Sequence, residues 1–299
     1  MSRGLTLRVA LNRAWARTWP FTRGRGLAAR LLALPASLAV PREADGSVVR
    51  TRGGARFRVH ADGMHDALWV WGSWDPWETE ALRRITRAGD VAFDVGANFG
   101  WFTVALARWG ARVHAFEPVP EHVEQLRDNL RVNGLEERVC VRGEALGEAE
   151  GTLRLHRFAG LPGGQVSASD LGRDDAEPVD VPLTTLDTYV GRAGLGGVDV
   201  LKIDVEGHEP AVFRGGERTL AAPDGPAILL EVNPECLAGH GLGARSVEGL
   251  LRELGYTSFV SVGVEGFRPV EGALPERFGN YVAFKPAHAD RRADLLQGG

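Results

Sequence analysis

Lysine is the scarcest charged residue of this 299-residue chain: Lys202 and Lys285 stand against 33 arginines. A lysine in such an arginine-rich sequence indicates a position at which arginine cannot replace it. Lys202 is the more informative of the two because it interrupts an apolar stretch. A buried lysine needs an acidic partner or a lowered pKa. We therefore expect Lys202 to form a structural ion pair or to belong to an active site.

Cysteines and long apolar runs are scarce as well. Cys140 and Cys236 are the two cysteines, and they make neither a metal-binding spacing nor a disulfide framework, which fits a reducing compartment. The best apolar run, residues 31–40, contains Pro35 and falls short of the roughly 20 residues of a membrane span. The arginine-containing leader before it is too long and too charged for a secretory signal. These absences predict a cytoplasmic protein without a transmembrane segment.

Charge is unevenly distributed along the chain. Residues 1–60 contain twelve arginines against Glu43 and Asp45, a net charge of +10, which leaves −14 for the remainder of the total of −4. The basic front is either a solvated arginine-rich face or a surface for an anionic partner, such as a phosphate-bearing acceptor, an acidic carrier protein or a membrane. The length, with 44% hydrophobic and 25% charged residues, suits one large α/β domain with an appendage.

The most informative stretch is VAFDVGANFGWFT, residues 91–103. It predicts a strand, a tight turn and the start of a helix. Gly96 can adopt backbone angles that a side chain forbids, and Gly100 leaves room for a ligand at the first helical turn. The motif G-x-G-x-x-G is missing, and Asp94 would repel a pyrophosphate, so a nicotinamide-dependent oxidoreductase is disfavoured. Asp94 suits a cationic ligand instead.

A second apolar run, residues 111–116, ends in Glu117-Pro118. An acid at the tip of the second strand is placed to accept both hydroxyls of a ribose. Asp94 for a positively charged amino-acid end and Glu117 for a ribose together describe S-adenosylmethionine. Glu144 follows the third strand and either meets the adenine edge or is an exposed loop acid. The expected cofactor-binding residues are Asp94, Gly96, Asn98, Gly100, Glu117 and Glu144.

The stretch VDVLKIDVEGHE, residues 198–209, reads as a buried parallel strand followed by a polar loop. Side chains two residues apart share a face, so Lys202 and Asp204 point the same way. Asp204 lies at the carboxyl end, where open α/β sheets bind ligands. Glu206 and His208 follow within one turn. The expected catalytic residues are Asp204, His208, Lys202 and Glu206.

The segments FDVGANFGWFT, FEP, LKIDVEGHE and LLEVNPE resemble those of the FkbM family of S-adenosylmethionine-dependent methyltransferases, over residues 74–285. The resemblance implies the class I methyltransferase fold: an α/β, Rossmann-like, seven-stranded sheet with helices on both faces and an antiparallel last strand. It also implies methyl transfer to a hydroxyl of a sugar or a polyketide-type natural product, that is, to a small-molecule acceptor that is free, glycosylated or carrier-bound. A non-catalytic cofactor-binding or carrier-docking module remains an alternative.

Two further expectations concern the acceptor. An enzyme that methylates nucleobase amines would follow its fourth strand with an Asn/Asp-Pro-Pro-aromatic turn, whereas this chain has Asp204-Val205-Glu206-Gly207. Nucleic acid is therefore not the expected acceptor. The hydroxyl proton goes to His208 or a carboxylate oriented by Lys202, or else Asp204, Glu231 and Asn233 hold a divalent cation that lowers the pKa of the acceptor. Lys202 would repel a metal, which favours the route without one.

The expected domain layout has three parts. Residues 1–73 form a basic extension with helices over 5–18 and 26–39 and a hairpin over 47–60, residues 74–286 form the methyltransferase domain, and residues 287–299 form a flexible tail. The oligomeric state stays open. Strands are expected at residues 91–93, 111–116, 138–142, 152–158, 179–184, 198–205, 227–232, 256–262 and 279–284.

Overall fold

The structure is a computed structural model that describes residues 39–158, 166–169 and 176–297. These residues belong to two compact units, one before Trp77 and one from Trp77 onward. The helices expected over residues 5–18 and 26–39 lie, apart from residue 39, outside the described residues. Within the described part of the chain, no helix has the length and the apolar character that a bilayer crossing requires.

The first unit contains the expected hairpin. Strands β1 (Val48–Arg50) and β2 (Arg56–Arg58) pair antiparallel, with Val49 opposite Phe57. Both of these side chains are buried, whereas their strand neighbours are more exposed, which is the alternation of a strand with one covered face. Helix η2 (Arg42–Ala44) precedes the hairpin, and helix α3 (Asp66–Trp71) follows it.

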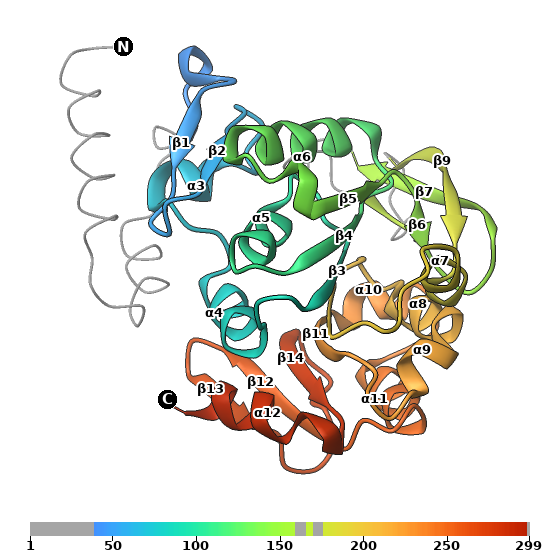
Figure 1. Cartoon of the computed structure of the whole chain (residues 1–299). Coiled ribbons are helices and arrows are strands. Elements are labelled where there is room, and N and C mark those ends of the chain that lie inside the picture. Colours follow the sequence, from blue (N-terminus) through green and yellow to red (C-terminus); the bar gives the residue numbers. More distant parts are fainter. Residues whose placement is uncertain (1–38, 159–165, 170–175, 298–299) are drawn as a thin grey trace. The chain divides into compact units, whose positions relative to one another are not determined.

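The second unit is built on a mixed sheet in the order β13-β12-β14-β11-β10-β3-β4-β5 (Figure 1). The pairs from β11 to β5 are parallel, and β14 runs antiparallel to both of its neighbours. The strands are β3 (Val91–Val95), β4 (Arg112–Phe116), β5 (Val139–Arg142), β10 (Val200–Ile203), β11 (Ala227–Val232), β12 (Ser258–Gly263), β13 (Gly266–Pro269) and β14 (Gly279–Phe284).

The eighth strand corrects the expected count of seven. Gly266, at a φ of 87°, lets the chain reverse directly after β12, so that residues 266–269 pair antiparallel with it as β13. Four residues that end in a proline give no periodic pattern, and the sequence therefore did not indicate this edge strand. The other seven strands, including the antiparallel β14, agree with the Rossmann-like arrangement that the resemblance implies.

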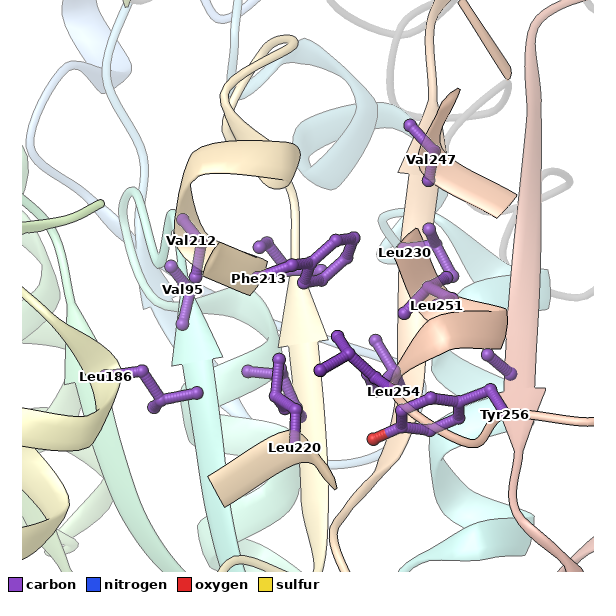
Figure 2. Packing of buried hydrophobic residues seen from close by; sticks show 14 of the residues in the cluster. Val95, Leu186, Val212, Phe213, Leu220, Leu230, Val247, Leu251, Leu254 and Tyr256 are labelled. Atoms are coloured by element: carbon purple, nitrogen blue, oxygen red, sulfur yellow. The ribbon is translucent and has the colours of Figure 1, made fainter. Parts of the chain in front are cut away.

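One face of the sheet carries the apolar core. Phe93, Leu201 and Leu230 belong to this face of β3, β10 and β11 and to one buried cluster with Phe213 and Leu251 of the covering helices. Leu230, Phe213 and Leu251 are shown in Figure 2. All five side chains are at most 1% exposed. Burial of each such side chain contributes roughly 1.5–3 kcal/mol. The helices of this face are α7 (Leu186–Arg192), α8 (Glu209–Gly215), α9 (Glu217–Ala221) and α11 (Ala244–Glu253).

The opposite face is more polar in its centre. The register places Asp94 of β3, Lys202 of β10 and Leu229 of β11 in one row. Helix α5 (Trp101–Arg108) covers this row, since the Thr103 hydroxyl donates to Asp94 and the Phe102 ring lies under the Lys202 ammonium. The remaining helices of this unit are α4 (Pro76–Ile85), α6 (Pro120–Asn133), α10 (Pro234–Ala238) and α12 (Ala289–Leu296).

A smaller sheet follows β5 in the chain. Its order is β6-β9-β7-β8, with β6 (Ala145–Leu146), β7 (Gly151–Phe158), β8 (Val166–Ser167) and β9 (Ala176–Thr184). The antiparallel pair β7 and β9 accounts for the strands expected over residues 152–158 and 179–184. Leu155 and Val181 are buried and belong to a small apolar cluster of this sheet.

The C-terminal segment differs from the flexible tail expected for residues 287–299. Residues 289–296 form α12, with Leu295 fully buried. Arg291 donates to both carboxylate oxygens of Asp90, over 2.6 and 3.0 Å. Asp90 lies just before β3, some two hundred residues earlier, so sequence pattern alone could not reveal that this charged segment is anchored.

This anchor predicts a stability loss when it is removed. Arg291→Met should lower the free energy of unfolding by about 1–3 kcal/mol, because the buried Asp90 carboxylate loses two charge-assisted hydrogen bonds. Arg245→Met is the matched control, since that exposed arginine lies 4.0 Å from Glu276 and should change stability by less than about 0.5 kcal/mol. Urea unfolding followed by circular dichroism measures both. Equal effects of the two substitutions would contradict the anchoring role of α12.

Candidate functional site

The turn between β3 and α5 has the backbone that its glycine predicts. Gly96 has a φ of 80°, and a Cβ atom built on it would lie 1.9 Å from the backbone oxygen of Asp204. A side chain at residue 96 would therefore collide with the loop that follows β10. Asn98 also has a positive φ, 50°, and its side-chain oxygen accepts from the Phe99 amide over 2.7 Å. Asparagine tolerates this conformation better than other residues with side chains.

The structure explains the glycine at residue 100 differently from the sequence. Its φ is 91°, and a Cβ atom there would lie 2.2 Å from Cδ1 of Leu126 on α6. The space that a side chain would occupy at Gly100 is thus filled by a neighbouring helix. Helix packing explains this glycine, and contact of its backbone with the cofactor stays a prediction.

Glu117 lies at the tip of β4, beside the glycine turn, and is 4% exposed. One carboxylate oxygen accepts from the Asn98 amide over 2.7 Å, and the other accepts from the Val119 amide over 3.0 Å. Nδ1 of His122 lies 3.4 Å from the second oxygen. A carboxylate oxygen can accept more than one hydrogen bond, so Glu117 is fixed in place and keeps acceptor capacity for a ribose.

Glu144 lies on the exit of β5, as expected. Its Oε1 accepts from Arg142 over 2.7 Å and from Arg192 over 3.3 Å. Both arginines also lie over the ring of Tyr189, at 5.6 and 5.9 Å from its centroid. Glu144 is therefore not a free loop acid, and its contact with adenine stays a prediction.

Asp94 is fully buried, which changes its expected role. Its Oδ2 accepts from the Thr103 hydroxyl, while Oδ1 is buried and has no hydrogen-bond partner among the described residues. Burial raises the pKa of Asp94, and the charge of Lys202 opposes that shift. The buried carboxylate faces Lys202. It is therefore not exposed for the direct contact with a cationic ligand that the sequence predicted.

Lys202 lies between the glycine turn after β3 and the loop after β10. Its Nζ lies 3.8 Å from Oδ1 of Asp94 and 3.5 Å from Oδ2 of Asp204, and it donates to the Gly96 carbonyl over 3.4 Å. The Phe102 ring centroid lies 4.9 Å below it, so the ammonium also has a cation–π contact. The expected common face of Lys202 and Asp204 is confirmed. Lys202 connects the glycine turn with the loop after β10.

The loop from Asp204 to His208 carries most of the polar groups. The Asp204 side chain is 35% exposed and is the more accessible partner of Lys202. Glu206 has a φ of 53°, and its Oε2 accepts from the Cys236 thiol over 3.5 Å. Glu209, at the start of α8, accepts from the amides of Val205 and Gly207 over 3.1 and 3.3 Å. Its side chain thus holds the loop closed.

His208 is less suited to the role of proton acceptor than its position in the motif suggested. Its Nε2 is buried without a hydrogen-bond partner among the described residues, and a Cβ atom on Gly147 would lie 3.0 Å from it. Burial lowers the pKa of His208 to about 4, and His240 adds to that shift while Glu148 opposes it. His208 is therefore a neutral and weak base at neutral pH.

Glu231 lies beside Asp204 at the end of the adjacent strand. The last paired residues of β10 and β11 are Ile203 and Leu230, so the next residues, Asp204 and Glu231, are neighbours. Burial raises the pKa of Glu231 to about 9, with further contributions from the negative charges of Asp204, Glu206 and Glu209, while Lys202 opposes the shift. Burial similarly raises the pKa of Glu209 to about 7.

In the alternative metal site of Asp204, Glu231 and Asn233, two of the three side chains already have partners. Oδ1 of Asn233 accepts from the amides of Glu235 and Cys236, over 3.2 and 3.5 Å, and caps α10. The Lys202 ammonium already lies beside Asp204. Among the residues that the structure describes, no group of three or more His, Cys, Asp or Glu side chains is arranged to hold a metal ion.

Two further residues of the site were not expected from the sequence. Thr103 and Phe102 of α5 bind Asp94 and Lys202 from the covering helix. Thr103 is fully buried, and a hydroxyl in an otherwise apolar helix start is a signal of a buried polar partner. Phe102 gave no comparable signal, because one aromatic residue in an apolar helix is ordinary core.

Comparison with known sequences gives a clear match. The family described as the methyltransferase FkbM domain matches residues 94–257. The chain is 33% identical over 199 residues to 31-O-demethyl-FK506 methyltransferase FkbM of Streptomyces tacrolimicus, which covers 57% of this chain and 74% of that protein. It is 27% identical over 198 residues to 2-O-methyltransferase NoeI of Sinorhizobium fredii, which covers 61% of this chain and 79% of that one.

Solved structures are similar at a greater distance. The crystal structure of methyltransferase FkbM from Methylobacillus flagellatus has a TM-score of 0.42 and 13% sequence identity, and the alignment covers 73% of this chain and 52% of that chain. An S-adenosylmethionine-dependent O-methyltransferase from Thermotoga maritima has a TM-score of 0.41 and 17% identity, with 81% and 78% covered.

Proposed function

The chain belongs to the FkbM family of methyltransferases, and from this premise we propose that it transfers a methyl group from S-adenosylmethionine to a hydroxyl group of a small molecule. S-adenosylmethionine is the cofactor of this family. The observation that carries the proposal is the position of Lys202. It contacts the glycine turn through the Gly96 carbonyl and the loop after β10 through Asp204. One side chain therefore positions both the turn proposed to bind the cofactor and the carboxylate proposed to accept the proton.

The cofactor supplies an electrophilic methyl group when it is bound, and the residues of the turn suit such a ligand. Glu117 is held at the tip of β4 by two backbone amides and keeps acceptor capacity for the ribose hydroxyls. The positive φ values of Gly96 and Asn98 give the turn its shape. Beneath it, Asp94 has a buried oxygen without a hydrogen-bond partner among the described residues, which adds negative potential under a cationic ligand.

The acceptor side is formed by the loop after β10. Asp204 is partly exposed and its carboxylate is fixed by Lys202 at 3.5 Å, which suits a group that accepts the hydroxyl proton in the transition state. His208 is turned toward Gly147 and is assigned a structural role. This arrangement favours the route without a metal, with Asp204 as the base and Lys202 as its positioning residue.

The proposed acceptor is a hydroxyl of a sugar or a polyketide-type natural product, free or attached to a carrier. This part rests on the relatives, because the names of two of them, a 31-O-demethyl-FK506 methyltransferase and a 2-O-methyltransferase, denote transfer to oxygen. Nucleic acid is not proposed, since the loop Asp204-Val205-Glu206-Gly207 lacks the Pro-Pro-aromatic turn expected of a nucleobase amine methylase.

The cofactor assignment predicts a binding defect. Glu117→Ala should weaken the binding of S-adenosylmethionine and of S-adenosylhomocysteine by more than about tenfold, because two charge-assisted hydrogen bonds of roughly 1.5–3 kcal/mol each are lost. Isothermal titration calorimetry measures both affinities. Glu121→Ala is the control, as that exposed acid on the next helix pairs with Arg157 at the surface. Unchanged affinity in Glu117→Ala, or tight binding of NAD by the native protein, would refute the assignment.

A further inference from the structure

Carboxylates gather at the carboxyl ends of β3, β10 and β11 more densely than an ordinary ion pair requires. We define the acid cluster as Asp94, Asp204, Glu206, Glu209 and Glu231. Asp94 and Asp204 lie within 4 Å of the Lys202 ammonium, and the negative charges of Asp204, Glu206 and Glu209 act on Glu231. Burial, with the neighbouring negative charges, raises the pKa of Asp94, Glu209 and Glu231 in this cluster, because both effects favour the protonated acid.

Glu231 is the member placed to exchange a proton with the site. It lies on the same face of the sheet as Lys202, because Leu229 pairs with Lys202 and Glu231 follows two residues later. Its cross-strand partner is Asn280 of β14, whose amide is already engaged with Glu78 of α4 over 2.7 Å. The charged and titratable groups around Glu231 are Asp204, Glu206 and Glu209 of the loop and α8, Lys202 of β10, and Cys236 of α10.

The proposed methyl transfer would change the charge of the bound cofactor. S-adenosylmethionine carries a positive sulfonium, whereas the product S-adenosylhomocysteine has a neutral sulfur. A positive charge a few ångströms from a carboxylate favours its ionised form, and the loss of that charge favours its protonated form. The proton affinity of the acid cluster therefore differs between the substrate complex and the product complex.

On the basis of the proposed function, we propose that Glu231 is the final acceptor of the hydroxyl proton and that the charge of the bound cofactor controls its protonation. Glu231 is protonated in the free protein and loses its proton when the cationic cofactor binds. During transfer the acceptor oxygen forms the O–CH₃ bond with one of its electron pairs, and the S–CH₃ bonding pair stays on sulfur. The hydroxyl proton passes through Asp204 to Glu231. One positive charge disappears and one carboxylate is neutralised, so the net charge of the site is conserved.

The raised pKa of Glu231, about 9, sets the conditions of the test. Near pH 8 the free protein holds this proton, and the binding of S-adenosylmethionine should release it to the buffer. Calorimetric titrations in buffers of different ionisation enthalpy give the number of protons released. We expect native protein to release about 0.5 proton or more per S-adenosylmethionine beyond the release by Glu231→Gln. For S-adenosylhomocysteine the two proteins should agree.

The comparison of native and variant protein cancels the titration of the ligands' own amino groups, which is common to both. Glu235→Gln is the matched control, because Glu235 is exposed and lies four residues further on. It should release as many protons as native protein. Equal proton release by native protein and Glu231→Gln on binding S-adenosylmethionine would overturn the proposal. Failure of native protein to bind either ligand would instead refute the proposed function.

A measurement on native protein covers the case in which the variant does not fold. Infrared difference spectra detect the carbonyl stretch of a protonated carboxylic acid. This band should be lost when S-adenosylmethionine is added and retained when S-adenosylhomocysteine is added. A band that responds equally to both ligands would contradict the dependence on cofactor charge.

Discussion

Asp204→Asn should lower kcat by about 100-fold or more, because the amide cannot accept the hydroxyl proton and general-base catalysis typically contributes 10²–10⁴-fold. The affinity for S-adenosylmethionine should change by less than about threefold, since Asp204 is one of several carboxylates beneath and beside the cofactor turn. The substitution keeps the size of the side chain. A selective effect on kcat therefore separates a chemical role from a binding role.

The experiment needs a methyl acceptor and a control substitution at another acidic residue. Formation of S-adenosylhomocysteine is measured with a panel of sugars and macrolactones that carry free hydroxyls. Asp224→Asn is the control, because Asp224 is exposed and precedes β11. Activity of the native protein should survive EDTA, whereas inactivation by EDTA with recovery in magnesium would restore the metal hypothesis. Native activity in Asp204→Asn would exclude that residue as the base.

The elements that positioned the site were predictable because their signals are local. The strand-turn-helix around Gly96 depends on residues within a dozen positions, and the structure has β3 and α5 there. The common face of Lys202 and Asp204 follows from the two-residue period of a strand.

The features that the sequence did not reveal depend on contacts between residues far apart in the chain. Gly100 gives no sign in its own stretch that Leu126 fills the space beside it. Asp204 and Glu231 are neighbours, as expected, because β10 and β11 pair in parallel, but the raised pKa of Glu231 depends on its burial, which the sequence does not specify. Asp94 could be assigned to the turn but not to a buried pair with Lys202, because burial depends on α5 lying across the sheet.

The two lysines offer a matched pair for the second prediction. Lys202 and Lys285 are 5% and 4% exposed. The ammonium of Lys202 lies within 4 Å of Asp94 and Asp204. The ammonium of Lys285 donates to the Leu254 carbonyl and lies 4.7 Å from the Tyr256 ring centroid. In the described part of the chain no carboxylate pairs with Lys285, so its removal leaves no acid behind.

Lys202→Met should destabilise the protein by about 3–5 kcal/mol near pH 8, because it leaves buried carboxylates without their counter-charge. The loss should shrink as the pH falls toward 5. Lys202 opposes the rise of the pKa of Asp94 and Glu231, so both acids in the variant bind protons more strongly in the folded than in the unfolded state. A raised folded-state pKa stabilises the fold below the unfolded value, and this stabilisation is lost as the pH rises through the folded value.

Urea unfolding at several pH values between about 5 and 8 separates this electrostatic effect from simple loss of packing. Lys285→Met also removes a buried ammonium and its stem, but its destabilisation should not show the same loss toward acidic pH, because among the described residues no carboxylate is left without its counter-charge. A pH-independent deficit in Lys202→Met, parallel to that of Lys285→Met, would mean that the ion contacts at the ends of β3 and β10 contribute only packing. A deficit that grows with pH in Lys202→Met alone would instead identify Lys202 as the counter-charge of Asp94 and Glu231 at the ends of β3 and β11.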